Sequence, residues 1–369
     1  MMLSLLSMAP LFGAEVPLYI GTYTNQGSQG IYVARFNPET GALSAPELAG
    51  EAQNPTFLAL HPSGKYLYAA NEVANYKGER AGMVTAFAID PKTAKLTFVN
   101  QVSSHGAGPC HVSLDRKGEA LLVANYGGGS VAAFTIAGDG RVRESTSFHQ
   151  HFGKGADPKR QERAHAHSIN ASPGNRFAVA ADLGTDSIYL YRLDAHRGMI
   201  TPHTPESVKT AAGAGPRHFA FHPDGKHGYA VNELDNTVTS YEWDEQTGTL
   251  TPKGSVRTLP ESFKETSYTA EILVHPSGKY LYASNRGHDS IAVFSLENPV
   301  APKPVQHMST GGVQPRNFTL DKTGKWLLAA NQRTGNIAVF SVDAASGKLT
   351  DTGKRIEVSA PVCLRLLEP

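Results

Sequence analysis

The sequence contains very little cysteine, which limits the kinds of site that it can build. Among its 369 residues only Cys110 and Cys363 are cysteines, and neither lies in a CxxC pair or at a Cys/His spacing typical of zinc sites. We expect both to be ordinary buried side chains without a disulfide between them, and Cys110 to be no nucleophile. The sequence therefore predicts no metal and no other cofactor.

The chain also lacks an excess of charge of either sign. It has 34 Lys and Arg against 33 Asp and Glu, a formal net charge of +1, and no basic block or tail. We therefore expect neither a nucleic acid nor an anionic membrane as a partner. No Rossmann or P-loop fingerprint is evident, and no GxSxG turn supports a covalent acyl-serine intermediate.

The apolar stretch at the N-terminus is too short to span a membrane. Residues 1–14, MMLSLLSMAPLFGA, are apolar and rich in small residues, as in the apolar region of a signal peptide, although no Lys or Arg precedes them. This predicts an exported protein, periplasmic or secreted. A non-exported N-terminal extension on a cytoplasmic protein is the alternative.

A long repeat occupies the remainder, residues 15–369. Copies include NPTFLALHPSGKYLYAANE from Asn54, GPRHFAFHPDGKHGYAVNE from Gly215 and QPRNFTLDKTGKWLLAANQ from Gln314. Turn glycines recur at intervals of roughly 50 residues, which predicts repeated supersecondary units. They are Gly64, Gly118, Gly174, Gly225, Gly278 and Gly324.

Each copy is typical of a four-stranded antiparallel sheet. A short alternating strand such as HFAFH is followed by a polar turn, PDGK, and then by a more apolar strand such as YLYAAN. A third alternating strand, such as VTAFAID, and a weaker fourth strand complete the unit. Such units, without helical periodicity, predict the blades of an all-β propeller.

The two ends of the chain together supply a further copy. PLYIGTYT from Pro17 matches a second strand with no first strand before it, and APVCLRLLEP at the C-terminus matches the missing element. We therefore expect residues 362–367 to pair with residues 18–22, which closes the ring and removes an exposed sheet edge. Six internal copies and this split copy predict seven blades in a single domain.

Two columns of residues should meet at one face of the propeller, because the first strand of a blade starts where the second ends. A proline recurs at the start of the first strand, as in Pro55, Pro109 and Pro216. Two residues after this position stand Phe57, His111, His167, His218, Glu271, Asn317 and Cys363. The residues just before these include Arg217 and Arg316, and the second strands end near Glu233, Asn285 and Arg286. A polar cluster at the mouth of a closed β-structure is a candidate ligand site.

Residues outside the repeat pattern are the better candidates for chemistry. His167, Arg217, Glu233 and Arg286 are of this kind. Arginines suit an anion or an oxyanion, and His and Glu can move protons near neutral pH. An ion-pair network between blades is the alternative. The repeated histidines, His61, His222 and His275, are expected to be structural.

A polar insertion between blades three and four, SFHQHFGKGADPKRQERAHAHS from Ser147, is too long for a tight turn. It is expected to form a lid over the mouth. Its HQH and HAH runs suggest a metal site, but no set of acidic ligands accompanies them.

Several segments resemble the bacterial propeller-type 6-phosphogluconolactonase family, which also includes a fungal carboxymuconate cyclase. They are RQERAHAHS, GPRHFAFHPDGKHGYAVNEL, SNRGHDSIAVF and QPRNFTLDKTGKWLLAANQ, and the resemblance runs from about Pro17 to the C-terminus. It implies a seven-bladed propeller, lactone chemistry without a metal, and a site that here matches His167, Arg217, Glu233 and Arg286. Ala164 stands where the family usually has proline before HAHS.

We therefore expect the chain to hydrolyse a small-molecule lactone, 6-phosphogluconolactone or a related aldonolactone, by general acid/base catalysis. His167 is the expected base, Glu233 its alternative or its orienting partner, and Arg217 and Arg286 the clamps for the oxyanion and the substrate anion. His111, His218, Arg316 and Asn285 are expected to bind substrate. Export would favour an unphosphorylated lactone.

Two other functions stay open at this stage. One is cycloisomerisation of a carboxymuconate-type acid. The other is a binding scaffold without catalysis, because segments such as YAVNELDNTVTSYEWD also resemble the YVTN-type repeats of surface proteins. The sequence does not indicate an oligomeric state.

Overall fold

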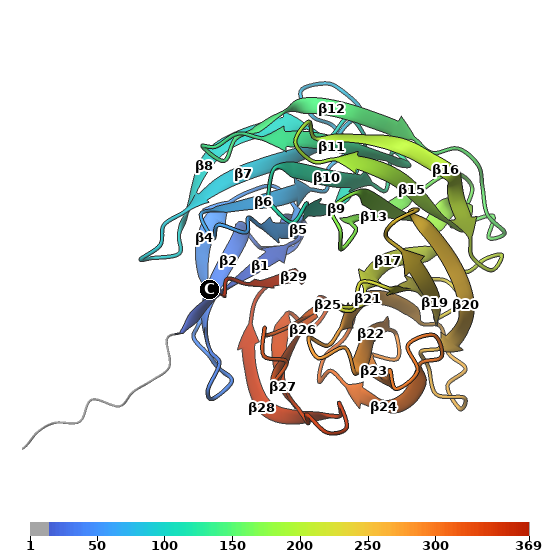
Figure 1. Cartoon of the computed structure of the whole chain (residues 1–369). Helices are drawn as coiled ribbons and strands as arrows, with labels where there is room; N and C mark the ends of the chain where they lie inside the picture. The colour runs from blue at the N-terminus through green and yellow to red at the C-terminus, as the bar shows by residue number, and fades with distance from the viewer. Residues whose placement is uncertain (1–14, 369) are drawn as a thin grey trace, which may run out of the picture.

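Seven antiparallel sheets surround a common axis in the computed structural model, which describes residues 15–368 (Figure 1). Apart from two short 3₁₀ turns, Thr24–Gln26 and Leu183–Thr185, the described residues form strands and loops. None of these residues forms a helix long and apolar enough to cross a membrane. The predicted seven-bladed all-β propeller is confirmed, whereas the predicted signal segment, residues 1–14, lies outside the described residues.

Six blades follow one another along the chain, each with four strands from the axis outward. Blade two is β5 (Pro55–Leu60), β6 (Tyr66–Asn71), β7 (Met83–Ile89) and β8 (Leu96–Ser103); blade three is β9 (Pro109–Leu114), β10 (Ala120–Asn125), β11 (Ser130–Ile136) and β12 (Val142–Gln150). Blade four is β13 (Ala166–Ala171), β14 (Phe177–Asp182), β15 (Ser187–Asp194) and β16 (Met199–Lys209); blade five is β17 (Pro216–Phe221), β18 (His227–Asn232), β19 (Thr237–Asp244) and β20 (Thr249–Arg257). Blade six is β21 (Tyr268–Val274), β22 (Tyr280–Arg286), β23 (Ser290–Ser295) and β24 (Lys303–Ser309); blade seven is β25 (Pro315–Leu320), β26 (Trp326–Asn331), β27 (Asn336–Val342) and β28 (Leu349–Glu357).

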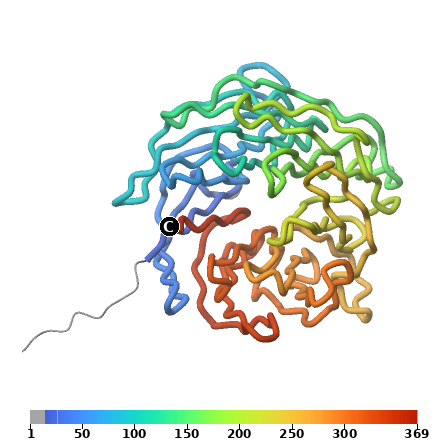
Figure 2. The backbone as a smooth tube through the Cα atoms, viewed as in Figure 1, coloured from blue at the N-terminus to red at the C-terminus, as the bar shows by residue number. Residues whose placement is uncertain are grey.

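Blade one is built from both ends of the chain. The C-terminal strand β29 (Pro361–Leu366) pairs antiparallel with β1 (Val16–Thr22), with Leu18 opposite Leu366 and Thr22 opposite Pro361. Strands β2 (Gly30–Asn37), β3 (Ala42–Leu43) and β4 (Glu47–Glu51) complete this sheet. In Figure 2 the two coloured ends of the chain lie side by side. The predicted closure is thus confirmed, and β29 covers the edge of β1 that would otherwise be exposed.

Tyrosines of the repeated second strands tie several blades to the next one along the chain. The hydroxyl of Tyr68 donates to the carbonyl oxygen of Gly140 at 3.1 Å, and that of Tyr282 donates to the carbonyl oxygen of Gly347 at 2.9 Å. Both acceptors lie in the outer turn of the next blade. The repeat therefore contains tyrosine because its ring fills the space between blades while its hydroxyl satisfies a turn carbonyl.

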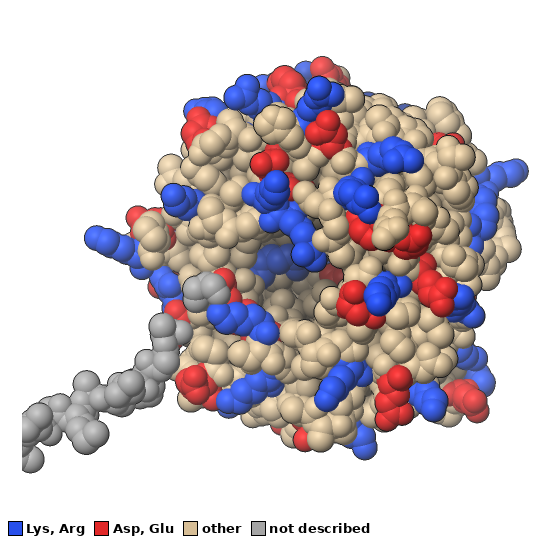
Figure 3. All heavy atoms as spheres, in the orientation of Figure 1, with Lys and Arg blue, Asp and Glu red and all other residues tan. Residues whose placement is uncertain are grey.

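The repeated histidines also have a structural role. In His61, His222 and His275 the ring Nε2 lies 3.1, 2.8 and 3.0 Å from the carbonyl oxygen of the turn glycine in the next blade. The expectation for these histidines is confirmed. Both cysteines are free and buried, as expected. The functional residues must therefore be found among those that the repeat does not require, around the axis. One face of the propeller is hollowed there, and Lys and Arg side chains lie in and around the hollow (Figure 3).

Candidate active site

Glu233 is the centre of a cluster of arginines drawn from two blades and from the insertion between blades three and four. Its carboxylate directly follows β18, is 4% exposed, and accepts from Nε of Arg217 at 3.0 Å. Arg286 at the end of β22 contributes Nη2 at 2.8 Å, and Arg160 from the loop before β13 contributes Nη2 at 2.6 Å. The insertion between blades three and four thus reaches this face and supplies one of the arginines.

The arginines keep Glu233 ionised. Burial alone would raise the pKa of this carboxyl, but the three guanidiniums outweigh burial and lower the pKa to about 2. A carboxylate with this pKa, whose oxygens already accept three charged hydrogen bonds, is a poor proton acceptor. The geometry therefore favours the orienting role of Glu233 over the alternative role of base.

Arg217 is almost fully engaged by the protein. Besides Glu233, its Nη1 donates to the carbonyl oxygen of Ala270 at 2.7 Å and to Nε2 of His218 at 3.0 Å. Burial, with the charges of Arg286 and Arg316, lowers the pKa of Arg217 to about 10, so it remains a cation at neutral pH. Its Nη2 has no hydrogen bond to the described residues, so this group is free to bind a ligand.

A second charged group lies beside the first. Arg316 donates from Nη2 to the hydroxyl of Tyr23 at 3.2 Å, and this hydroxyl donates to Oε2 of Glu72 at 2.8 Å. We call the whole set the arginine mouth; it consists of Arg160, Arg217, Arg286, Arg316, Glu72 and Glu233. Four guanidiniums against two carboxylates leave an excess of positive charge, which favours an anionic or oxyanion-forming ligand.

His167 lies beside the arginine mouth on β13. Its ring is 4% exposed and lies 5.3 Å from the ring of Tyr126 and 5.5 Å from that of His218. Burial lowers the pKa of His167 well below 6.5, and the charge of Arg217 adds to this. The imidazole is therefore neutral at physiological pH, which is the form that accepts a proton. Its Nδ1 lies 3.5 Å from Sγ of Cys110, and burial raises the pKa of that thiol to about 12, so Cys110 remains a thiol.

Below the arginine mouth a layer of side chains crosses the axis. We call it the closing layer; it consists of Phe57, His111, His218, Glu271, Asn317 and Cys363. Ring centroids in it are 4.3 Å apart for Phe57 and His111 and 5.3 Å apart for His111 and His218. His218 and Glu271 pair through Nδ1 and Oε1 at 2.8 Å, and Glu271 also accepts from the Asn317 amide.

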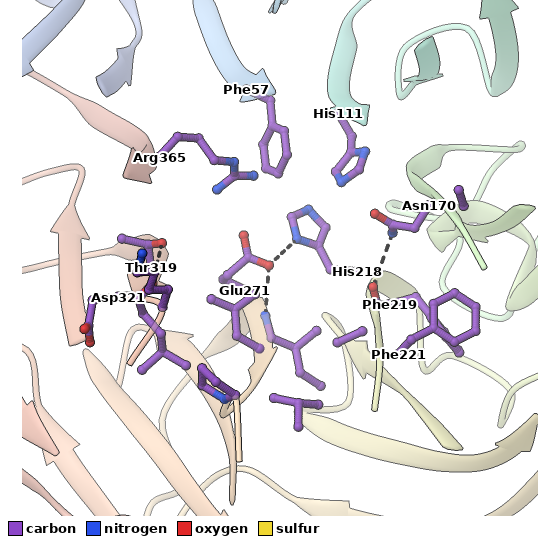
Figure 4. A pocket seen from close by; sticks show the side chains of 18 of the residues that line it. Phe57, His111, Asn170, His218, Phe219, Phe221, Glu271, Thr319, Asp321 and Arg365 are labelled. Carbon is purple, nitrogen blue, oxygen red and sulfur yellow. Dashed lines mark hydrogen bonds and ion pairs between the residues drawn. The ribbon is translucent and has the colours of Figure 1, made fainter. Parts of the chain in front are cut away.

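This layer separates two cavities. On the mouth side a space of about 10 Å³, enough for one water, is lined by residues that include Arg217, Arg316 and Cys110. On the other side lies a space of about 550 Å³, which we call the far chamber; it is lined by residues that include His111, Asn170 and Arg365 (Figure 4). Phe57 and His218 line both spaces and so lie between them.

The structure brings some of the predicted site residues together and separates others. His167, Arg217, Glu233, Arg286 and Arg316 meet around the arginine mouth. His218 lies in the closing layer and contacts Arg217, whereas His111 lines the far chamber.

Asn285 lies away from both cavities. It is fully buried, donates to the carbonyl oxygen of Thr258 at 3.0 Å and to Ser290, and accepts from the hydroxyl of Thr258. Its amide is thus fully used in hydrogen bonds to Thr258 and Ser290, so we leave Asn285 out of the proposed substrate site.

Arg160 and Glu271 were not among the predicted site residues. The length of the insertion is the signal that could have indicated Arg160, but Lys154, Lys159 and Arg163 lie in the same segment and nothing in the sequence distinguishes them. Glu271 occupies a position that is His, Asn, Phe or Cys in other blades, and its importance depends on His218 of the neighbouring blade.

Three of the four histidines in the HQH and HAH runs, His149, His151 and His165, are held by protein groups. His151 lies 2.7 Å from Asp182 and 2.7 Å from the hydroxyl of Tyr191, and His149 lies 2.8 Å from the carbonyl oxygen of Ile200. His165 lies 2.9 Å from the carbonyl oxygen of Tyr126. Each ring therefore has a local structural role.

One group in the described residues has metal-ligand types within reach of one another, His222, Asp224 and His227. It lies in a repeat turn. Both ring nitrogens of His222 and the Nδ1 of His227 already have partners within the turn or in the next blade, at 2.7 to 3.2 Å. Hydrogen bonding accounts for this group.

Comparison with known proteins identifies the family. The model of the seven-bladed β-propeller lactonase family matches residues 17–366. The chain belongs to this family. The 6-phosphogluconolactonase of Bacillus subtilis is 38% identical over 350 residues, which cover 95% of this chain and 97% of that protein. The 6-phosphogluconolactonase of Formosa agariphila is 34% identical over 360 residues, 95% of this chain and 99% of that protein.

Solved structures of the lactonase family agree. The periplasmic gluconolactonase PpgL of Pseudomonas aeruginosa superposes with a TM-score of 0.89 at 30% identity, covering 96% of this chain and 99% of that one. The expectation of a propeller lactonase is thus confirmed. The cycloisomerase and the binding scaffold are not favoured by these comparisons.

Proposed function

We propose that this lactonase hydrolyses a sugar lactone at the arginine mouth. The observation that carries the proposal is the convergence of three arginines on Glu233 beside a neutral His167. Lactone hydrolysis develops negative charge on the carbonyl oxygen, so fixed cations that already lie in place stabilise its transition state. Because the mouth-side cavity holds one water at most, the lactone ring would lie on the solvent side of the arginines.

The reaction can be assigned to the residues step by step. Water attacks the carbonyl carbon while His167 accepts one of its protons, and the free Nη2 of Arg217, with Arg286, stabilises the oxyanion. When the bond between the acyl carbon and the ring oxygen breaks, the imidazolium returns the proton to that oxygen. The product is an open-chain hydroxy acid. Glu233 touches no substrate in this scheme and holds the arginines in place.

His218 and Glu271 support Arg217 from below. Burial lowers the pKa of His218, against the opposing effect of Glu271, so the ring is neutral. Because its Nε2 accepts from Arg217, its proton lies on Nδ1 and is donated to Glu271. His218 therefore acts through Arg217 as a positioning residue.

Two observations bear on the substrate. The excess positive charge at the mouth suits the product carboxylate and leaves Arg160 or Arg316 for a phosphate, as in the substrate named for the B. subtilis relative. Export, predicted from residues 1–14, would favour an unphosphorylated aldonolactone, as in the P. aeruginosa relative. An N-terminal mass measurement on protein from the native host would show whether that segment is removed.

Acid release in a pH-stat tests the proposal on the full chain. Glucono-δ-lactone and 6-phosphoglucono-δ-lactone are each compared with their spontaneous hydrolysis, with and without a chelator. We expect saturable acceleration of at least one lactone, unchanged by chelation. A folded protein that accelerates neither lactone would contradict the proposal, and activity restored only by a divalent ion would contradict the metal-independent mechanism.

A further inference from the structure

No substrate atom enters the far chamber in the reaction above, although His218 and Glu271 in its wall support Arg217. Its volume of about 550 Å³ is that of a typical small-molecule site. Pro276, Asp321 and Lys322, from the turns between first and second strands, line it together with Glu368 near the C-terminus. It therefore opens at the end of the axis opposite to the arginine mouth.

His111 directs an unused donor into the far chamber. Its side chain is 5% exposed, and its Nδ1 accepts from the backbone N–H of Ile169 at 3.4 Å. Burial holds the pKa of His111 well below 6.5, so the ring is neutral and its hydrogen lies on Nε2. That nitrogen has no partner among the described residues, and the ring points toward the centre of the chamber in Figure 4. Because this donor faces the open chamber, a ligand that enters the chamber can accept its hydrogen bond.

Arg365 provides a second donor in a fixed position. Its guanidinium lies 4.6 Å from the ring of Phe57, with Nε donating to the carbonyl oxygen of Leu58 at 2.9 Å and Nη1 to that of Leu364 at 2.7 Å. Nη2 has no partner among residues 15–368. Because the backbone holds the other two nitrogens, this N–H group is aimed before any ligand arrives.

Acceptors and aromatic faces complete the walls. The Glu271 carboxylate lines the chamber, and Asn170 donates its amide to the carbonyl oxygen of Phe219 at 3.2 Å, which leaves its own oxygen free. Phe57 and Phe221 add aromatic surface. The charges of Arg365 and Glu271 offset each other, so the inner part of the chamber does not favour an anion.

We propose that the far chamber is a second ligand site, for a small neutral polyhydroxylated molecule of monosaccharide size. Donors, acceptors and aromatic faces spaced around one cavity match the hydroxyl groups and the apolar face of a sugar ring. The proposal does not depend on lactone hydrolysis at the mouth.

The test uses D-glucose as the probe, because it has no lactone bond to be hydrolysed. Calorimetric titration of the full chain should give saturable binding with a Kd on the order of 1 mM. His111→Phe, which keeps the ring against Phe57 but removes the donor, should weaken binding at least roughly tenfold, the loss of one buried hydrogen bond. Arg286→Ala, at the mouth, should leave Kd within about twofold.

A second measurement needs no variant of the far chamber. In wild-type protein labelled with nitrogen-15 at histidine, glucose should shift the Nε2 resonance of His111 and leave that of His167 unchanged. Absence of saturable binding, or binding that Arg286→Ala abolishes and that shifts only His167, would overturn the proposal. Neither of these two results bears on lactone hydrolysis, which the acid-release assay tests separately.

Discussion

The two ends of the propeller axis use the same residue types in opposite ways. At the arginine mouth, four guanidiniums surround two carboxylates, and the excess charge lies beside a neutral imidazole. In the far chamber, Arg365 and Glu271 offset each other around an aromatic wall. Excess charge suits a reaction that develops negative charge, whereas balanced donors and acceptors suit recognition of a neutral molecule.

The closing layer keeps the charges of the arginine mouth apart from those of the far chamber. Phe57 and His218 line both spaces, so the two ends of the axis are only one side chain apart. Removing this layer would let water and counter-ions from one end screen the charges of the other. Three kinds of change therefore test this comparison: changes in the pairing of β29 with β1, which we call the seam, changes at the arginine mouth, and changes in the closing layer.

Deletion of residues 361–369 should have the largest effect, because β29 contributes Val362 to the mouth-side cavity and Arg365 to the far chamber. It also exposes the inner edge of β1. We expect aggregation or loss of cooperative melting, measured by calorimetry and light scattering. A truncated protein that melts like the full chain would contradict the closure argument.

Arg286→Ala and His167→Ala should each lower kcat/KM on the order of a hundredfold, the size expected for loss of an oxyanion donor or a positioned base. Arg257→Ala, an exposed arginine on the outer strand β20, is the matched control and should stay within about twofold of wild type. Steady-state kinetics would measure the loss of activity, and thermal melts would show whether each variant is folded. Near-normal turnover in both folded mouth variants would refute the assignment of the mouth.

Glu233→Gln should change how stability depends on pH. The pKa of Glu233, about 2, is below its ordinary value of 4.5, so ionised Glu233 stabilises the fold fully above pH 4.5. This contribution, about 3 kcal/mol, is lost as pH falls through 2. Urea unfolding between pH 7 and 3 should therefore show a less stable variant at pH 7 and a difference that narrows with acid. A constant difference across this range would show that Glu233 is not held ionised by the arginines.

Glu271→Gln should have the smallest effect, roughly tenfold on kcat, because it acts through His218 and Arg217. Glutamine can present its NH₂ to His218, which would let the proton move to Nε2 and oppose Arg217. Glu242→Gln, an exposed partner of Lys253, is the control. Nitrogen-15 shifts of His218 report the tautomer directly. Unchanged kcat together with an altered tautomer would remove His218 from the positioning of Arg217.

The sequence predicted the architecture well because each propeller repeat contains its own strand pattern and turn residues in one contiguous stretch. Closure by β29 followed from one missing strand and one unassigned segment. The meeting of Arg217, Glu233 and Arg286 followed from the direction of antiparallel strands, since all three lie where a first strand starts or a second strand ends.

The depth of each side chain along the axis could not be predicted from the repeat. A bulge shifts the register between Pro216 and His218, so consecutive residues face the axis at different levels, and the period-2 pattern cannot show it. This is why His218 and His111 were expected at the mouth but lie in the closing layer. Arg160 was missed for another reason, since an irregular loop has no periodicity from which to infer its path.

The position of the seam has a consequence for how the molecule comes apart. Chain ends fray more readily than internal strands, and here both ends meet in blade one. Glu233, Arg217 and Arg286 come from blades five and six, and Arg160 from the insertion before blade four, all on the far side of the ring. A circular permutant that joins the present ends and opens the chain in an outer turn of blade two would move the fraying point while every contact of Glu233 stayed within an uninterrupted stretch of chain.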